Sequence, residues 1–337
     1  MSTDTARVPG GAAIVRPRRE TTGSWPLIDR VGYWLCWAAG VVLALIVVAM
    51  VVFMLVKGIS YLRPALFVES PAASLQQATS GGFLDPIIGT LMITGIGILL
   101  AGPAGVALAT WMSEYGRPPA LARTIESAID VIAGVPSVVL ALFGLLVFSE
   151  GFLGFLSQTA ANGSVYGRSF LAGGAMMGVL ALPLIVGSTR EGLAQVPDRM
   201  REASYALGKT KATTIRHVLL PAIRPQIASG IALGMGRIIG DTAIVTILVG
   251  ETLTNESVGS TPVFGSLRGT GSTLTSYVYR NSPAGEGNAP QKAYAAAFVL
   301  LMIVLALNAL VTRLTGASEG SGLRGALAGL RRMIWTR

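Results

Sequence analysis

Six long apolar runs alternate with shorter polar segments along the chain, and this alternation is the main pattern in the sequence. Each run is long enough for a helix to cross the hydrocarbon core of a bilayer, which takes roughly 17–25 residues. The pattern therefore predicts an all-α, polytopic membrane protein with six transmembrane helices. The runs cover residues 31–56, 86–113, 131–149, 169–189, 225–250 and 293–312.

The composition supports a membrane protein and argues against several other classes. Hydrophobic residues make up 52% of the 337 residues and charged residues only 13%, whereas about a quarter is charged in a typical soluble domain. A single cysteine, Cys36, and a single histidine, His217, leave no intrachain disulfide and little basis for a metal site. The net charge of +9 does not indicate a nucleic-acid partner, because the basic residues flank apolar runs instead of forming a stripe.

The distribution of Lys and Arg predicts the orientation in the membrane. Nineteen of the 26 lie in the two terminal regions and in the two loops on the same side, and six lie in the three opposite loops. By the positive-inside rule, both termini are expected in the cytoplasm, with the chain in the plasma (inner) membrane of a bacterium. The predicted organisation is a disordered tail over residues 1–30, a membrane domain over 31–315 and a basic tail over 316–337.

The largest predicted cytoplasmic loop, residues 190–224, contains most of the motif information. Between Asp198, a suitable N-cap, and Gly208, a suitable left-handed stop, apolar residues recur at helical spacing and predict a short amphipathic helix. A second short helix is expected from about Lys211 to Leu220. A basic amphipathic pair of this kind can lie on lipid headgroups, which is one interpretation of the loop.

The order of residues within the loop favours a different interpretation. Glu202-Ala203-Ser204, then Gly208, then Val218-Leu219-Leu220-Pro221, resembles the EAA loop of the membrane subunits of ATP-binding-cassette importers. Ser204 stands where the family pattern has a second alanine, and Val218 where it has isoleucine. The resemblance implies that six residues couple this chain to separate ATPase subunits: Glu202, Ala203, Ser204, Gly208, Leu220 and Pro221.

Motifs outside the loop narrow the resemblance, which covers roughly residues 30–315. They are similar to those of the phosphate-specific transport permeases, and the openings of the second and last runs favour the A-type over the C-type subunit. One departure is Asp241, because that family usually has glutamate there. The motifs are Gly81-Gly82-Phe83, Ile88-Gly89-Thr90-Leu91, Ser113-Glu114-Tyr115, Ala133-Gly134-Val135-Pro136-Ser137, Leu142-Phe143-Gly144, Arg237-Ile238-Ile239-Gly240-Asp241-Thr242 and Lys292-Ala293-Tyr294.

This resemblance implies a set of partners: a second, C-type permease, two ATP-binding cassette subunits and an extracytoplasmic phosphate-binding protein. The chain has no Gly-x4-Gly-Lys-Ser/Thr phosphate loop, so ATP and Mg are expected on the partner ATPase and no cofactor on this chain. We therefore expect a transport subunit and not an enzyme. Two alternatives stay open: a permease for sulfate, molybdate or another small solute, and a secondary carrier that acts alone.

Two charges interrupt the fifth run, and charges inside a membrane helix usually have a partner or a function. Arg237 has a planar fork of five donors that suits an oxyanion, and Asp241 can accept a hydrogen bond from a protonated phosphate. Because they lie four residues apart, the two side chains could equally pair with each other on one helix. The sequence predicts both residues in the substrate path or its gate, with the intrahelical pair as the alternative.

Overall fold

Every regular element in the described part of the chain is a helix. The computed structural model describes residues 27–71, 81–149, 151–157, 166–252, 255, 262–283, 285 and 289–315. Four helices there are long and apolar enough to cross a membrane, and they coincide with the first, second, fourth and sixth predicted runs. This agreement confirms the all-α membrane fold. The four are α1 (Leu27–Gly58), α2 (Leu84–Thr110), α5 (Phe170–Gln195) and α12 (Pro290–Leu314).

The first helix, α1, exposes apolar side chains on all sides. The described residues up to Phe53 form one compact unit and those from Met54 onward form another. Within the first unit, Trp34, Leu43 and Val48 are all exposed. A helix that is apolar around its whole circumference needs lipid or another membrane helix around it.

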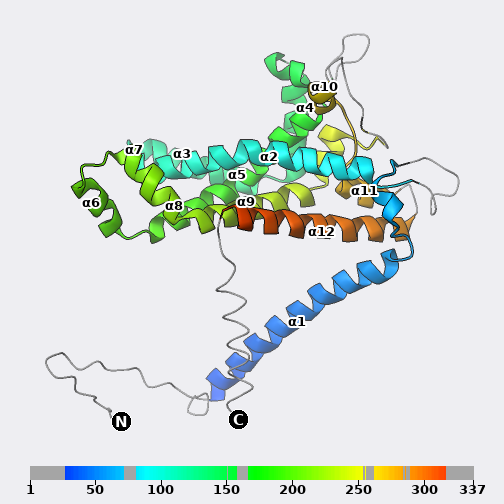
Figure 1. The fold of residues 1–337 in the computed structure, drawn as a ribbon, viewed down its shortest axis with the longest axis horizontal. Coiled ribbons are helices and arrows are strands. Elements are labelled where there is room, and N and C mark those ends of the chain that lie inside the picture. Colours follow the sequence, from blue (N-terminus) through cyan, green and yellow to red (C-terminus); the bar gives the residue numbers. More distant parts are fainter. Residues whose placement is uncertain are drawn as a thin grey trace. The chain divides into compact units, whose positions relative to one another are not determined.

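In the second unit, α2, α5, α9 (Arg224–Gly240) and α12 lie side by side (Figure 1). Glycines allow α2 and α5 to approach closely. A Cβ added at Gly174 would lie 2.6 Å from Cγ2 of Ile96, and one added at Gly105 would lie 2.8 Å from Cγ2 of Ile185. Small residues of this kind let membrane helices pack tightly. The main apolar core lies between α2, α4 (Ser137–Ser149), α5, α9 and residues 244–249.

The third predicted run, residues 131–149, is not one straight helix, and this part of the prediction is wrong. α3 (Pro119–Gly134) and α4 meet at an angle of 107°, so that α4 points away from the bundle (Figure 1). The residue before a proline avoids the helical region because its backbone would clash with the proline ring. Val135, which precedes Pro136, accordingly has an extended ψ of 129°.

The fifth predicted run, residues 225–250, is also broken. α9 ends at Gly240, and Asp241 has an extended backbone with φ −82° and ψ 124°. Its Oδ1 accepts a hydrogen bond of 3.0 Å from the N–H of Ile244, and such local bonds compete with helix continuation. A separate turn over Val245–Val249 follows.

Counting each bent pair of helices as one span raises the number of candidate spans in the described residues from four to at most six. One pair is α3 with α4. The other joins α9 to the preceding helix, Lys211–Ala222, at an angle of 70°.

The predicted tails, residues 1–30 and 316–337, lie almost wholly outside the described residues. The exception is residues 27–30, which are helical, so α1 begins four residues before the predicted start at Val31. The boundaries of the membrane domain otherwise stay a prediction.

Candidate functional site

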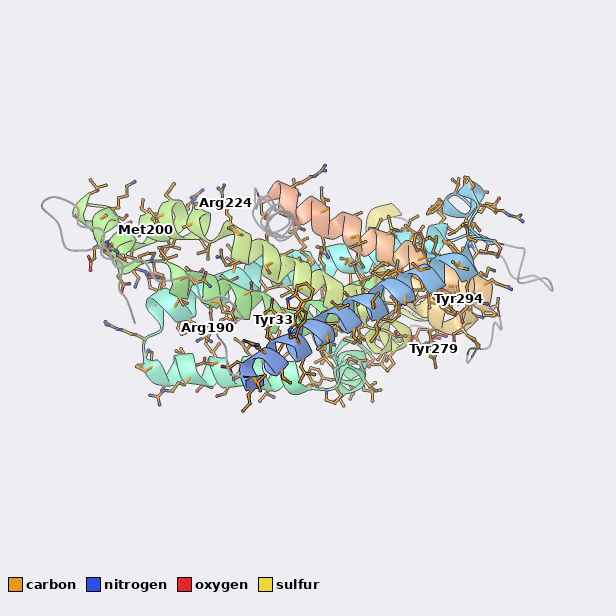
Figure 2. All side chains as sticks on the ribbon, turned by 90° about the horizontal axis from the view of Figure 1, so that it is seen from below. Tyr33, Arg190, Met200, Arg224, Tyr279 and Tyr294 are labelled. Carbon is orange, nitrogen blue, oxygen red and sulfur yellow. The ribbon has the colours of Figure 1, made fainter. Side chains whose placement is uncertain are left out.

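Two short helices form a hairpin at one end of the second unit, and we call residues 198–222 the loop hairpin. Figure 2 shows Met200 and Arg224 at this end of the unit, and Tyr279 and Tyr294 at the opposite end. Both helices predicted in the loop are confirmed. The hairpin comprises α6 (Asp198–Ala206), α7 (Lys211–Thr214), a π-helical turn (Ile215–Leu219) and α8 (Leu220–Ala222).

The apolar side chains of α6 face outward. Met200 and Tyr205 are 41% and 42% exposed, and Leu207, directly after the helix, is 78% exposed. Glu202 and Ala203 are exposed as well. Exposed apolar side chains gathered on one short helix indicate a surface for another molecule.

Ser204, by contrast, is buried between the two helices. Its hydroxyl lies 2.8 Å from that of Thr214, and this hydrogen bond links α6 to α7. Leu220 and Pro221 are partly buried at the far end of the hairpin, before the bend at Ile223. The six residues predicted to couple the chain to an ATPase therefore differ in exposure: Ser204 is buried, Leu220 and Pro221 are partly buried and the other three are exposed.

Gly208 ends α6 in the left-handed conformation, with φ +73°, as its sequence context predicts. The N–H of Gly208 donates to the carbonyl of Tyr205 at 2.9 Å, and the N–H of Lys209 donates to the carbonyl of Ser204 at 3.2 Å. This pair of bonds is a Schellman motif, which terminates a helix and turns the chain sharply. No atom lies within 4 Å of a Cβ added at Gly208. Glycine is therefore needed there for its backbone conformation and not to make room for a neighbouring residue.

The start of α6 differs from the prediction. Pro197 is the N-cap residue and makes no side-chain cap, while Asp198 is the first residue of the helix. The Asp198 carboxylate instead accepts a hydrogen bond of 3.1 Å from Nη1 of Arg201. Its charge in the first turn still favours the helix, since helix N-termini attract anions.

The base of the loop hairpin is held to α5 by apolar contacts. Ile215, Leu219 and Ile223 are buried against Leu193 and Val196 at the end of α5. The second helix of the hairpin is thus part of the packed protein, whereas α6 buries only Ser204.

Glu114 lies in a π-helical turn, Trp111–Tyr115, that continues α2. It connects both helices of the hairpin to this end of α2, a contact that sequence reasoning did not predict. Its carboxylate forms an ion pair of 3.1 Å with Nη2 of Arg201 in α6. Its backbone carbonyl accepts a hydrogen bond from Nζ of Lys211 in α7, and the same ammonium lies 4.7 Å from the ring centre of Tyr115. Spacing does not indicate the contact, because Glu114 and Arg201 are 87 positions apart along the chain.

Arg237 and Asp241 do not share one helix face, and the predicted helical geometry of the pair is wrong. Arg237 lies in the last turn of α9 and is exposed, whereas Asp241 lies beyond the helix end and caps Ile244. Among the ion pairs of the described residues, none joins these two side chains. Their predicted place in the substrate path stays a prediction.

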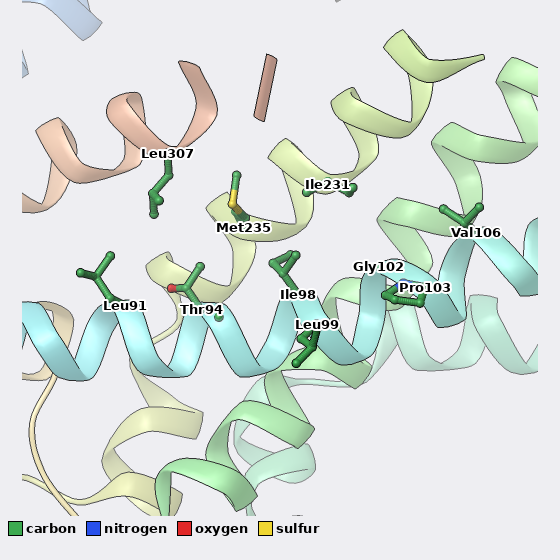
Figure 3. Close-up of a pocket in the computed structure, with 11 residues that line it drawn as sticks. Leu91, Thr94, Ile98, Leu99, Gly102, Pro103, Val106, Ile231, Met235 and Leu307 are labelled. Carbon is green, nitrogen blue, oxygen red and sulfur yellow. The ribbon is translucent and has the colours of Figure 1, made fainter. Parts of the chain in front are cut away.

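An apolar groove of about 600 Å³ separates α2, α9 and α12 (Figure 3). Leu91 and Thr94 of α2, Met235 of α9 and Leu307 of α12 line it. The hydroxyl of Thr94 is used within its own helix, where it donates to the carbonyl of Thr90 at 2.6 Å. The groove offers no charge for an oxyanion, so it suits lipid or an apolar helix.

At the opposite end of the unit, the buried Lys292 at the start of α12 lies between two aromatic rings. Its Nζ is 5.8 Å from the ring centre of Tyr61 and 5.9 Å from that of Tyr277. Burial is the main cause that raises the pKa of Tyr61 to about 12, and its hydroxyl donates to the carbonyl of Gly81 at 2.9 Å. Residues of two predicted motifs, Gly81 and Lys292, therefore both contact Tyr61 in the packing at this end of the unit.

A bundle of apolar helices with an exposed hairpin at one end defines the class of the protein, which is a multi-pass membrane protein. The chain belongs to the family of binding-protein-dependent transport system inner membrane components, whose family model matches residues 101–321. It is therefore a membrane-spanning transport subunit.

Two similar proteins cover most of the chain. Phosphate transport system permease protein PstA 1 of Mycobacterium tuberculosis (strain CDC 1551 / Oshkosh) is 33% identical over 248 residues, which are 73% of this chain and 74% of that protein. Phosphate transport system permease protein PstA of Haemophilus influenzae is 30% identical over 288 residues, 84% and 87% of the two chains.

The fold also matches a solved transporter. A chain of the bacterial alginate ABC transporter, solved with an alginate pentasaccharide-bound periplasmic protein, superimposes with a TM-score of 0.59 and 16% sequence identity. The match covers 85% of this chain and 94% of that chain, and it shows that the two share a fold.

Proposed function

We propose that the chain is one of two membrane subunits of an ATP-driven importer of inorganic phosphate. The similarity to phosphate transport permeases of two bacteria over 73% and 84% of the chain carries this assignment. The exposed α6 supports ATP-driven import, because it presents a compact surface to which ATPase subunits can bind. ATP and Mg belong on those partner subunits, and this chain acts in transport without catalysing hydrolysis itself.

The complete importer contains a second, C-type permease, two ATPase subunits and an extracytoplasmic phosphate-binding protein. The apolar groove between α2, α9 and α12 and the apolar circumference of α1 support a membrane partner, because each leaves hydrophobic surface uncovered. Glu202, Ala203, Ser204, Gly208, Leu220 and Pro221 form the coupling site, and Arg237 and Asp241 belong to the substrate path or its gate.

The substrate can be tested by complementation. In a bacterial strain without its own phosphate importers, the chain expressed with its partners should restore uptake of labelled phosphate. A tenfold excess of unlabelled phosphate should suppress the label, and the same excess of sulfate or molybdate should not. Uptake of labelled sulfate or molybdate in place of phosphate would identify a permease for a different solute.

The orientation is a separate prediction: the loop hairpin and both termini face the cytoplasm. With the exposed Cys36 replaced by serine, Tyr205→Cys should resist a membrane-impermeant thiol reagent in intact cells and react after permeabilisation. Tyr279→Cys is a matched control, since Tyr279 is 56% exposed and lies at the opposite end of the unit (Figure 2). It should react in intact cells, and the reverse pattern would refute the orientation.

A further inference from the structure

A polar junction lies where the turn that continues α2, the end of α5 and α6 meet. Arg201 of α6 donates three hydrogen bonds to other elements. Its Nε reaches Oε1 of Glu114 at 3.2 Å, its Nη1 the carbonyl of Val196 at 2.8 Å and its Nη2 the carbonyl of Leu193 at 3.1 Å. One planar guanidinium thus binds the ends of two long helices at once, which suits its fixed fork of donors.

The two charged side chains are shielded from solvent. The Glu114 side chain is only 7% exposed and that of Arg201 19%, whereas Asp198, the other acid near Arg201, is 87% exposed. Charge pairs are screened less when they are partly buried, and removing one partner leaves the other uncompensated. The contact with Glu114 is therefore the more important of the two ion pairs.

Without this junction, α6 has few ties to the bundle. Among the described residues, its side chains are linked to other elements through Arg201 and through the hydrogen bond between Ser204 and Thr214. Its covalent connection to α5 runs through Val196 and Pro197, which are both extended. Extended residues between helices can absorb a rotation, so a force on α6 could be lost in bending at this point.

We propose that Glu114 is a positioning residue that locks the loop hairpin to the ends of α2 and α5. This inference rests on the proposed function and adds the route of coupling: a displacement of α6 by an ATPase subunit moves Arg201, and Arg201 moves α2 through Glu114 and α5 through two carbonyls. Lys211 makes a parallel connection from α7 to the Glu114 carbonyl. The hairpin and the two helices then move as one body.

The test is the number of phosphate ions taken up per ATP hydrolysed by the complete importer in proteoliposomes. Glu114→Gln retains the side-chain shape and the backbone carbonyl but removes the charge. It should still assemble and hydrolyse ATP, while uptake per ATP falls by about fivefold or more, the scale of a typical coupling between sites.

Glu126→Gln is the matched control. Glu126 forms an ion pair of 2.8 Å with Arg190, but its side chain is 45% exposed and this pair does not involve α6. The importer with Glu126→Gln should take up as much phosphate per ATP as the wild type. An unchanged ratio in Glu114→Gln, or an equal loss in both variants, would overturn the proposal.

Two further measurements keep the result decisive. If Glu114→Gln does not assemble, Arg201→Lys retains the positive charge but lacks the fork, and a normal ratio there would refute the role of the junction. Hydrogen exchange of the α6 amides in the complex should rise in Glu114→Gln and not in Glu126→Gln. Unchanged exchange in Glu114→Gln would contradict the proposed role of Glu114, whichever solute the importer carries. A wild-type complex that takes up no phosphate would contradict only the proposed function.

Discussion

Replacing Gly208 by valine should uncouple ATP hydrolysis from transport. Gly208 holds φ +73° at the end of α6, and a non-glycine residue there costs about 1–2 kcal/mol, most for a β-branched side chain. If this strain shifts α6 from its docking position, uptake should fall by about five- to thirtyfold, since that is the range that 1–2 kcal/mol represents. Insertion into the membrane should persist.

Gly208→Asn is the matched variant for this prediction. Asparagine is close to valine in size but tolerates the left-handed conformation, so it should retain most of the uptake. No atom lies within 4 Å of the added Cβ, which removes a clash inside the chain as an explanation. Equal loss in both variants would mean that size at the docking surface matters and that the backbone does not.

Replacing Arg237 by glutamine should abolish most phosphate uptake while the subunit still inserts and assembles. A guanidinium in a membrane helix is costly to keep. Among the described residues no ion pair joins Arg237 to Asp241, whose carboxylate caps Ile244. A hydrogen bond to a charged group contributes about 1.5–3 kcal/mol, so the expected loss is about ten- to hundredfold. Arg224→Gln, the same change at the other end of α9, should have little effect.

Adding Asp241→Asn separates a substrate role from a structural pair. Asparagine can still accept the hydrogen bond from Ile244, so Asp241→Asn alone should cost little in stability. The double variant Arg237→Gln/Asp241→Asn should stay as inactive as Arg237→Gln. Recovery of uptake in the double variant would show that the two charges pair with each other in the working importer, and that Arg237 does not act on the anion.

The long helices of this fold could be predicted from hydrophobicity alone. Charge-free runs over residues 31–56, 86–113, 169–189 and 293–312 correspond to four helices, because a continuous apolar segment in a membrane must satisfy its own backbone. The left-handed Gly208 was also predictable, since few residues other than glycine adopt that conformation.

The breaks in the third and fifth runs were harder to predict, because hydrophobicity indicates whether a segment lies in an apolar environment and not which backbone conformation it adopts. Pro136 gave a local signal for the first break. At Asp241 the same residue can extend a helix or cap a new turn, and the choice depends on its bond to Ile244. The junction of Glu114 with Arg201 was not predictable from spacing, since it forms only when α2 and α5 pack together.

The most direct test of the central claim is uptake by proteoliposomes that contain this chain, its partner permease and the two ATPase subunits. With phosphate-binding protein outside, labelled phosphate should accumulate only when ATP and Mg are enclosed, and omission of the ATPase subunits should abolish it. Accumulation by this chain alone, driven by an ion gradient without ATP, would contradict the account and identify a secondary carrier.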